Sequence, residues 1–158
     1  MLRFFYKRVV KKILFLIDPE IVHLRAMALW QAMGRSKLAA GVMRGMFAAT
    51  PASVKQSLFG LEFTGPVGLS AGFDYEAKLT QILPALGFGF GTVGTLTYLP
   101  YGGNARPMLG RLIQSRSLMV NKGFKNKGVA ATMASLRGAT FAYPVGISIG
   151  KTNTPRIT

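Results

Sequence analysis

Three short apolar segments that each end in small residues constrain the fold more than any other feature of this chain. Residues 67–71, 88–97 and 145–150 are expected to form strands, and their carboxyl ends read Ser-Ala-Gly, Gly-Thr and Ser-Ile-Gly. Helices are predicted between these strands, over 78–86 and 126–137, and each is followed by a glycine. Near-continuous apolar strands that alternate with helices are typical of a parallel sheet covered by helices.

Both a doubly wound sheet and a (β/α)-barrel fit this order of elements. In a barrel the ligand site gathers at the carboxyl ends of the strands. Small residues at those ends leave room for a flat ligand and let backbone N–H groups reach it. The glycines of "GFGFG" at 87–91 precede a strand instead of opening a helix, so they do not match a dinucleotide-binding motif. The strand ends therefore favour the barrel.

The first 17 residues are predicted to form a cationic amphipathic helix. At 100° per residue, eight apolar side chains share one arc and five bases lie opposite. The longest uncharged run nearby, 13–17, is far shorter than the roughly 20 residues that span a bilayer. The pattern is typical of a helix that lies in a membrane interface, with its bases on lipid headgroups, although a surface helix packed on a core has the same periodicity. The bases are Arg3, Lys7, Arg8, Lys11 and Lys12.

A second helix is predicted over residues 19–33. Asp18 is a good N-cap, Pro19 suits the first helical position, and the acid at the next position favours the positive helix end. Gly34 is expected to end the helix. A looser helical stretch follows over 36–59, so that two apolar helices in succession form a hairpin able to enclose an apolar ligand.

The remaining segments are predicted to be short or irregular. The helical stretch over 36–59 is expected to break around Thr50-Pro51, and a short strand follows over 61–63. A loop rich in glycine and proline covers 98–110. Residues 109–113 and 117–120 are expected to pair as a small hairpin.

The composition narrows the classes of function. The net charge is +15, and no acid occurs after residue 76, although ten Lys and Arg do. A basic surface attracts phosphates, nucleic acid or anionic lipid, but the aromatic residues fall in strand and helix cores and not on stacking platforms, so no nucleic-acid partner is expected. One explanation for the charge is that the balancing acids lie in a part of the chain not present here. With no cysteine and only His23, no metal site is expected, and His23 is interpreted as structural.

Six stretches spread over nearly the whole chain carry a resemblance to a known family. In chain order they are "IDPEIVH", "GLEFTGPVGLSAGFD", "LGFGFGTVGTLT", "YGGNARPMLGRL", "NKGFKNKGVAA" and "PVGISIGKTNTP". Together they resemble the N-terminal half of dihydroorotate dehydrogenase of the membrane-associated, quinone-using class (class 2), as a divergent branch.

The resemblance implies an α/β fold: the N-terminal part of a (β/α)8 TIM-type barrel, preceded by an amphipathic helical hairpin. Residues 1–59 are then the helical membrane and quinone-tunnel region, and residues 60–158 hold the first three strands of an FMN-binding barrel. Because eight strands close a barrel, an incomplete barrel is expected. The implied activity is FMN-dependent oxidation of dihydroorotate to orotate in pyrimidine biosynthesis, with electrons passed to quinone. The implied location is peripheral, at the cytoplasmic face of the cell membrane, on anionic lipid through residues 1–17.

The resemblance also assigns site residues. Those expected to contact FMN are Ala71, Gly72, Tyr75, Thr95 and Ser148. Those expected to contact the dihydroorotate or orotate are Tyr75, Asn121, Lys122, Gly123 and Phe124.

Two departures from the family pattern fall within this set. Tyr75 stands where the family usually has a lysine that touches both flavin and substrate. Val120 occupies the place of a substrate-binding asparagine, and Asn121 comes one position later. Lys122 or Lys78 is expected to supply the missing cation.

The catalytic base of the family is a serine in a Ser-x-Pro-Asn-Thr-Pro loop, and it is expected beyond residue 158. The similar Asn153-Thr154-Pro155 follows the third strand directly and is interpreted as a false match. The chain alone is therefore expected to be an inactive fragment. The alternative is a non-catalytic, basic, membrane-binding half-barrel module.

Overall fold

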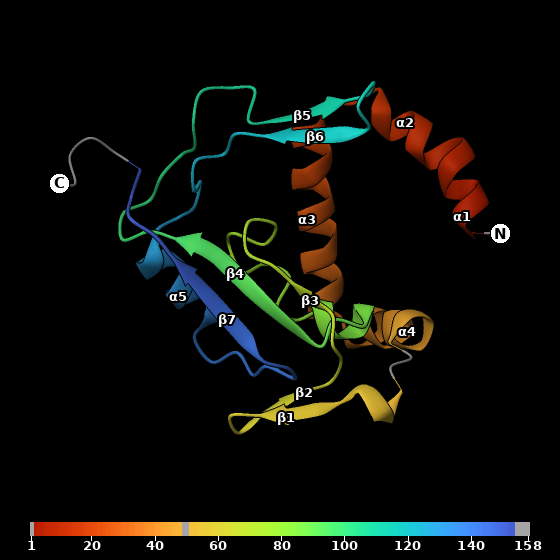
Figure 1. The fold of residues 1–158 in the computed structure, drawn as a ribbon, viewed down its shortest axis with the longest axis vertical. Coiled ribbons are helices and arrows are strands. Elements are labelled where there is room, and N and C mark those ends of the chain that lie inside the picture. Colours follow the sequence, from red (N-terminus) through yellow and green to blue (C-terminus); the bar gives the residue numbers. More distant parts are fainter. Residues whose placement is uncertain (1, 49–50, 154–158) are drawn as a thin grey trace.

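The computed structural model describes residues 2–48 and 51–153. Its centre is a three-stranded sheet of β3 (Gly68–Leu69), β4 (Phe90–Leu96) and β7 (Val145–Ile149), in the order β3-β4-β7. Both pairings are parallel, with Leu69 opposite Gly91 and Val93 opposite Ile147. The predicted parallel sheet is confirmed, and the described strands form an open sheet (Figure 1).

The connection from β3 to β4 differs from the prediction. Turns and one 3-10 helix, η3 (Leu83–Leu86), replace the α-helix predicted over 78–86. Pro84 lacks the N–H that an α-helix would need, and Gly87 ends the turn with a φ of 88°. Upstream, the Asp74 carboxylate takes the N–H groups of residues 78 and 79, which draws them into a turn.

The connection from β4 to β7 contains the predicted hairpin and helix. Strands β5 (Leu109–Leu112) and β6 (Ser117–Val120) pair antiparallel, and α5 (Val129–Leu136) follows. The helix begins three residues later than predicted because Asn126 has another role. Its amide donates to Thr97 Oγ1 and to the Phe124 carbonyl, both at 2.7 Å, and its Oδ1 accepts from the N–H of residue 128.

Residues 2–15 form one continuous helical stretch. It runs through α1 (Leu2–Phe5), the π-helix η1 (Tyr6–Val10) and α2 (Lys11–Phe15), and it stands away from the sheet (Figure 1). The apolar arc predicted here is not packed on the core: Leu16, for example, is 88% exposed. Met1, the first residue of the predicted helix, lies outside the described residues.

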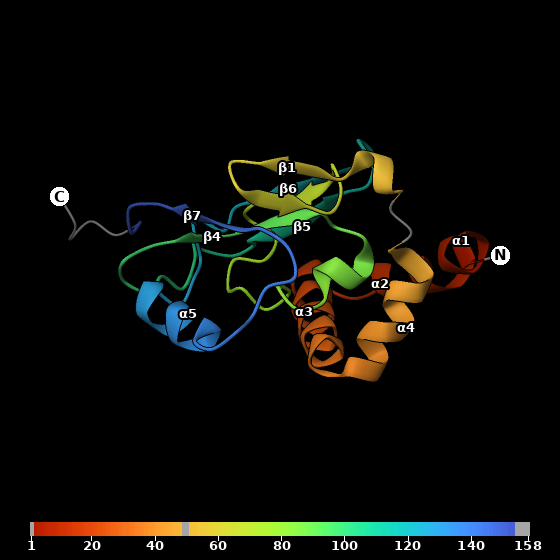
Figure 2. The same cartoon turned by 90° about the horizontal axis from the view of Figure 1, so that it is seen from below.

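Helices α3 (Pro19–Arg35) and α4 (Lys37–Phe47) lie side by side (Figure 2). The predicted cap is confirmed, since Asp18 Oδ1 accepts from the N–H groups of residues 20 and 21 at 2.8 and 3.2 Å. Ser36 begins α4 in the same way by accepting the N–H of Ala39 at 3.2 Å. No helix in the described part of the chain is long and apolar enough to cross a bilayer.

The helical stretch predicted over 36–59 is wrong in its last part. After α4 the described chain forms the short η2 (Ala52–Val54) and then β1 (Gln56–Leu58), which pairs antiparallel with the predicted strand β2 (Leu61–Phe63). Phe59 and Gly60 make the turn with φ of 53° and 75°, a conformation typical of tight hairpins. The boundary expected between residues 59 and 60 falls within this turn. Thr50, at the expected break, lies outside the described residues.

The core lies where α3 and α4 meet η3 and the amino-terminal end of the sheet (Figure 2). Its buried members are Met27, Leu79, Ile82, Leu83, Ala85 and Tyr143.

Strand β7 is less buried than predicted. Ile149 is 83% exposed, and Ile147 also faces solvent. Within the described residues β7 pairs only with β4, so it is an edge strand with an uncovered face.

We predict that Ile82→Ala lowers the free energy of unfolding by about 2–5 kcal/mol, because the Ile82 side chain is fully buried in the core and its loss leaves a cavity. Urea unfolding followed by circular dichroism measures the change. Leu38→Ala, at an exposed position on α4, is the control and should change it by less than about 0.5 kcal/mol. Equal effects of the two substitutions would contradict this location of the core.

Candidate functional site

A cavity of about 390 Å³ opens at the carboxyl ends of β3 and β4, beneath the segment that follows β6. Eight of the nine site residues expected from the sequence line it. These are Ala71, Gly72, Tyr75, Thr95, Asn121, Lys122, Gly123 and Phe124. The structure therefore brings together residues that are up to 53 positions apart in the chain.

Ser148 is the expected residue that does not line the cavity. Its hydroxyl lies 2.9 Å from Thr95 Oγ1, so the two side chains form a hydrogen bond between β4 and β7. Ser148 is therefore placed to orient the Thr95 hydroxyl, which itself faces the cavity.

Backbone forms one wall of the cavity. The N–H of Gly72 donates to the Gly94 carbonyl at 2.8 Å, and the N–H of Gly94 donates to the Asp74 carbonyl at 3.2 Å. Gly72 has a φ of 99°, which disfavours any side chain, and no atom lies within 4 Å of the place a Cβ would take. This part of the wall is thus flat and open.

Asp74 holds the turn beneath that wall. Its two carboxylate oxygens accept the N–H groups of Lys78 and Leu79 at 2.7 and 2.8 Å. Burial raises the pKa of this carboxyl, and the two backbone hydrogen bonds act in the opposite direction. Asp74 is therefore a structural acid that supports the cavity from behind.

Lys122 places an ammonium group over the ring of Tyr75, 4.6 Å from its centroid. Burial raises the pKa of the Tyr75 phenol, and burial together with nearby Lys125 lowers the pKa of Lys122. The other candidate cation, Lys78, pairs with Glu76 and does not line the cavity. Of the two candidate cations, only Lys122 reaches the cavity.

Asparagines form the opposite wall. Asn104 Nδ2 donates to Asn121 Oδ1 at 2.8 Å, and Asn104 Oδ1 accepts from the Tyr101 hydroxyl at 2.8 Å. Gly123 has a φ of 62°, and a Cβ there would collide with the Asn104 amide. Asn104 lines the cavity although it was not among the expected site residues, and its only signal was its place in the motif "YGGNARPMLGRL".

Glu20 connects helix α3 to this wall. Its carboxylate is buried and lies 3.5 Å from Lys125 Nζ and 3.6 Å from Arg106 Nε. The sequence indicated only a helix-start acid at this position. Lys125 also lines the cavity and was missed, as were Gly94 and Val120.

His23 lies behind Tyr75. The two rings stack with centroids 6.1 Å apart, and the His23 ring meets Phe73 edge to face at 5.3 Å. Its Nε2 is buried without a hydrogen-bond partner among the described residues. Burial, with a smaller effect of Lys122, lowers the pKa of His23 to about 4. The ring is therefore neutral at pH 7 and packs as an aromatic residue.

Comparison with known proteins gives a consistent family. The family model for dihydroorotate dehydrogenase matches residues 53–155. A dihydroorotate dehydrogenase (quinone) from Mycobacterium sp. (strain KMS) is 40% identical over 143 residues, which cover 90% of this chain and 40% of that protein. The chain belongs to the dihydroorotate dehydrogenase family. A dihydroorotate dehydrogenase (quinone) from Sulfurovum sp. (strain NBC37-1) is also 40% identical, over 94% of this chain and 42% of its own length.

Solved structures agree with this family. The crystal structure of the Eimeria tenella dihydroorotate dehydrogenase in complex with ferulenol superposes with a TM-score of 0.65 at 28% identity. The match covers 85% of this chain and 36% of that one. The fold is thus the first part of a TIM-type barrel, as predicted, and the chain spans about two fifths of the length of the curated dihydroorotate dehydrogenases it matches. In the described ranges, no three potential metal ligands of the His, Cys, Asp or Glu type gather.

We predict that protonation of His23 destabilises the fold at acid pH. The unfolded histidine has a pKa of about 6.5 and the folded one a pKa of about 4, so the unfolded chain binds more protons between these values. The free energy of unfolding should therefore fall as the pH drops from about 6.5 to about 4. Allowing for partial exposure of the ring, the loss is on the order of 1 kcal/mol.

The measurement is urea unfolding at pH 7 and pH 5 for the parent protein and His23→Phe, which keeps an aromatic ring next to Tyr75. The raised pKa of Asp74 acts in the opposite direction in both proteins and cancels in the comparison. The His23→Phe variant should lose less stability at pH 5 than the parent. The same loss in both proteins would show that His23 does not titrate with unfolding.

Proposed function

We propose that this chain forms part of an enzyme that oxidises dihydroorotate to orotate with FMN as cofactor and quinone as electron acceptor, within pyrimidine biosynthesis. The observation that carries the proposal is the cavity itself. It gathers a flat backbone wall, hydroxyls, amides and two lysines from four parts of the chain. The curated relatives named as quinone-type dihydroorotate dehydrogenases support the same reaction.

The residues present fit FMN. A planar ring system suits the open wall at Ala71 and Gly72, where a side chain would collide with it. The hydroxyl of Thr95, oriented by Ser148, and the phenol of Tyr75 are hydrogen-bonding groups for the ring edges. When bound, FMN accepts a hydride and passes electrons on to quinone. Its phosphate belongs to the loops after the seventh and eighth strands of such barrels, beyond this three-stranded part.

The substrate proposal rests on the opposite wall. Dihydroorotate carries a carboxylate, and Lys122 Nζ is the cation that the cavity offers near Tyr75. Partial burial strengthens an ion pair at this position relative to one in open solvent. The amides of Asn121 and Asn104 add donors and acceptors for the polar edge of a pyrimidine ring.

Proton removal needs a further group. None of the residues that line the cavity carries a carboxylate or an imidazole. In the family the base is a serine on a later loop, so we expect the 158 residues alone to give no sustained turnover. Without that group, loss of the substrate proton is slow.

We also propose peripheral attachment to an anionic membrane, at the cytoplasmic face of the cell membrane, through residues 1–17. Five bases and an uncovered apolar arc occur in this stretch, and the first acid of the chain is Asp18. Each base near an anionic surface contributes about 1 kcal/mol of attraction.

The deciding experiment joins this chain to the strands that complete its barrel and assays dihydroorotate oxidation with a soluble quinone analogue. Flavin retained through purification, with orotate and reduced quinone formed in equal amounts, is the expected result. Liposome binding with no flavin and no turnover would instead favour the non-catalytic membrane-binding module.

We predict that Lys122→Ala in the completed enzyme raises the KM for dihydroorotate at least about 10-fold, because the substrate carboxylate loses its cation, a change of about 1.4 kcal/mol. Steady-state kinetics measure the effect. Lys78→Ala is the matched control, since Lys78 pairs with Glu76 outside the cavity, and its KM should stay within about twofold of the parent. If the KM of Lys122→Ala also stays within about twofold of the parent, Lys122 does not bind the substrate.

Deletion of residues 1–17 should release the protein from phosphatidylglycerol vesicles, because it removes five bases and the exposed apolar arc together. Co-sedimentation measures binding, and circular dichroism shows whether the shortened protein stays folded. Phosphatidylcholine vesicles are the control for charge. A folded protein that sediments as well after the deletion would contradict the assignment.

A further inference from the structure

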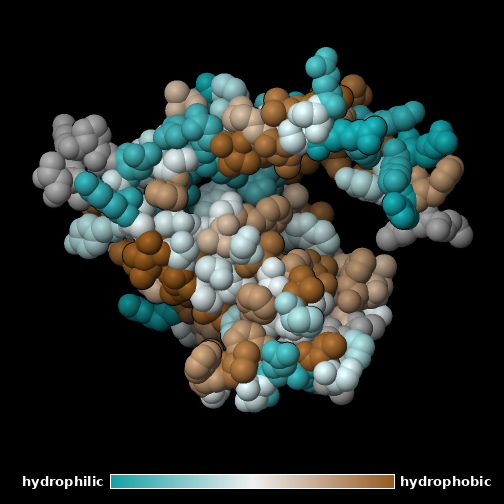
Figure 3. Space-filling model, viewed as in Figure 1, coloured by the Kyte–Doolittle hydropathy of each residue, from teal (hydrophilic) through white to brown (hydrophobic). Residues whose placement is uncertain are grey.

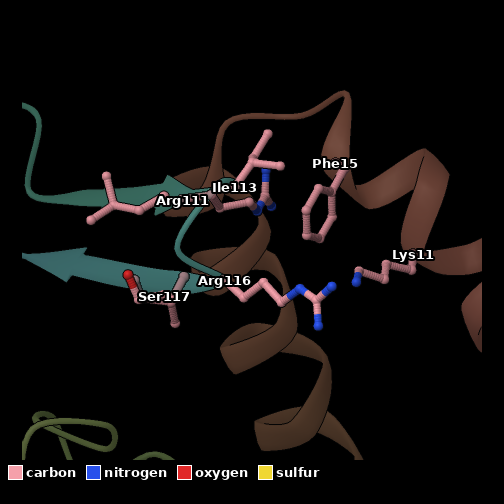
Figure 4. A pocket seen from close by; sticks show the side chains of 8 residues that line it. Lys11, Phe15, Arg111, Ile113, Arg116 and Ser117 are labelled. Atoms are coloured by element: carbon pink, nitrogen blue, oxygen red, sulfur yellow. The ribbon is translucent and has the colours of Figure 1, made fainter.

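A second cavity, of about 420 Å³, lies between α2 and the β5–β6 hairpin (Figure 4). Three bases line it and no acid does. The residues that matter here are Lys11, Phe15, Arg111, Ile113, Arg116 and Ser117.

Arg111 fixes the walls of this basic cavity relative to each other. Its guanidinium donates to the carbonyls of Leu14 and Ile17 at 3.0 and 2.8 Å, at the end of the first helical stretch. The same group stacks over the Phe15 ring, 4.6 Å from its centroid. Because the Arg111 guanidinium is bonded to helix-end carbonyls, it connects the hairpin to the helix. The bases available to bind an anion are then Lys11 and Arg116.

Lys11 and Arg116 point toward one another across the cavity (Figure 4). Neither forms an ion pair with an acid of the described chain: every such pair involves Glu20 or Glu76 instead. Two like charges that converge in a partly apolar hollow repel each other, and an anion placed between them removes this cost. Ammonium and guanidinium donors suit the oxygens of a phosphate.

The hairpin turn holds this arrangement in place. The N–H of Arg116 donates to the Ile113 carbonyl at 3.3 Å, and the hydroxyls of Ser115 and Ser117 are 2.7 Å apart. The turn presents Ile113 outward, 71% exposed. Leu16 lies between the two residues whose carbonyls Arg111 binds, and its side chain is exposed.

Aliphatic and basic side chains therefore share one surface. Figure 3 shows hydrophobic side chains over the β5–β6 hairpin next to hydrophilic ones of the first helical stretch. A nucleic acid would leave Ile113 and Leu16 in water, whereas a bilayer takes aliphatic groups below its headgroups and bases at their level. The mixture fits a lipid surface.

We propose that the basic cavity between α2 and the β5–β6 hairpin binds the headgroup phosphate of an anionic phospholipid, with Ile113 and Leu16 inserted beside it. The hairpin is thus a second membrane-contacting element, which begins 92 residues after the end of the first one. This proposal rests on the membrane contact proposed for residues 1–17 and extends it to a defined site.

The test uses the absence of cysteine from the sequence. Ile113→Cys provides one attachment point for a nitrobenzoxadiazole label, whose emission shifts to the blue in an apolar environment. Phe59→Cys is the matched control, since Phe59 is a fully exposed apolar residue in the turn of the β1–β2 hairpin at the other end of the molecule (Figure 1). On phosphatidylglycerol vesicles the label at 113 should shift and the label at 59 should not.

The outcomes separate the two proposals. If the protein sediments with the vesicles and the label at 113 stays in a water-like environment, the hairpin site is wrong and the contact of residues 1–17 stands. If the protein does not sediment with anionic vesicles, both are wrong.

Charge substitutions test the phosphate directly. Arg116→Gln should weaken binding to phosphatidylglycerol vesicles about fivefold, which corresponds to about 1 kcal/mol for one base at the surface. Arg137→Gln removes the same charge from an exposed position at the end of α5 and should have less than a twofold effect. Equal losses in both variants would show attraction to net charge alone and would overturn the site.

Discussion

The buried carboxylate of Asp74 is the interaction on which the rest of this structure depends. The two carboxylate oxygens accept consecutive backbone N–H groups. The backbone carbonyl of Asp74 accepts the N–H of Gly94 from the neighbouring strand. An ionised carboxylate in this place is costly unless it is fully hydrogen-bonded, so the turn has one favourable conformation. On one side that turn presents the open backbone wall at Gly72, and on the other it leads into the core at Leu79 and Ile82.

The cavity owes its polar character to a long-range set of contacts. Glu20, at the start of α3, pairs with Lys125 of the cavity wall and with Arg106 outside it. Tyr75 lies between His23 of the same helix and the ammonium of Lys122. Helix α3 is therefore a structural part of the site, because the Tyr75 ring packs on His23 and Lys125 pairs with Glu20.

The strand ends and the family motifs allowed most of the residues that line the cavity to be predicted, since small residues after an apolar run indicate a close approach to the backbone. The start of α3 was also predictable from a local pattern, because the Asp18 side chain caps the helix. The α-helix predicted over 78–86 is wrong because Pro84 lacks the N–H that the helix interior would need and Gly87 ends the segment in a left-handed conformation, and apolar periodicity reports neither constraint. The roles of Asn104 and Glu20 were not predicted, because they depend on partners up to 105 residues away in the chain. No local sequence pattern encodes such a pairing.

Strand β6 begins at Ser117 in the basic cavity and ends at Val120 in the wall of the candidate site cavity. At about 3.4 Å per residue, it separates the two cavities by only about 10 Å. The strand therefore fixes the distance between the two cavities. If the Ser117 end of β6 rests on phosphate headgroups, its Val120 end holds a water-soluble substrate at a fixed short distance from the lipid. An apolar electron carrier dissolved in that lipid can then react with the enzyme while the substrate stays in water.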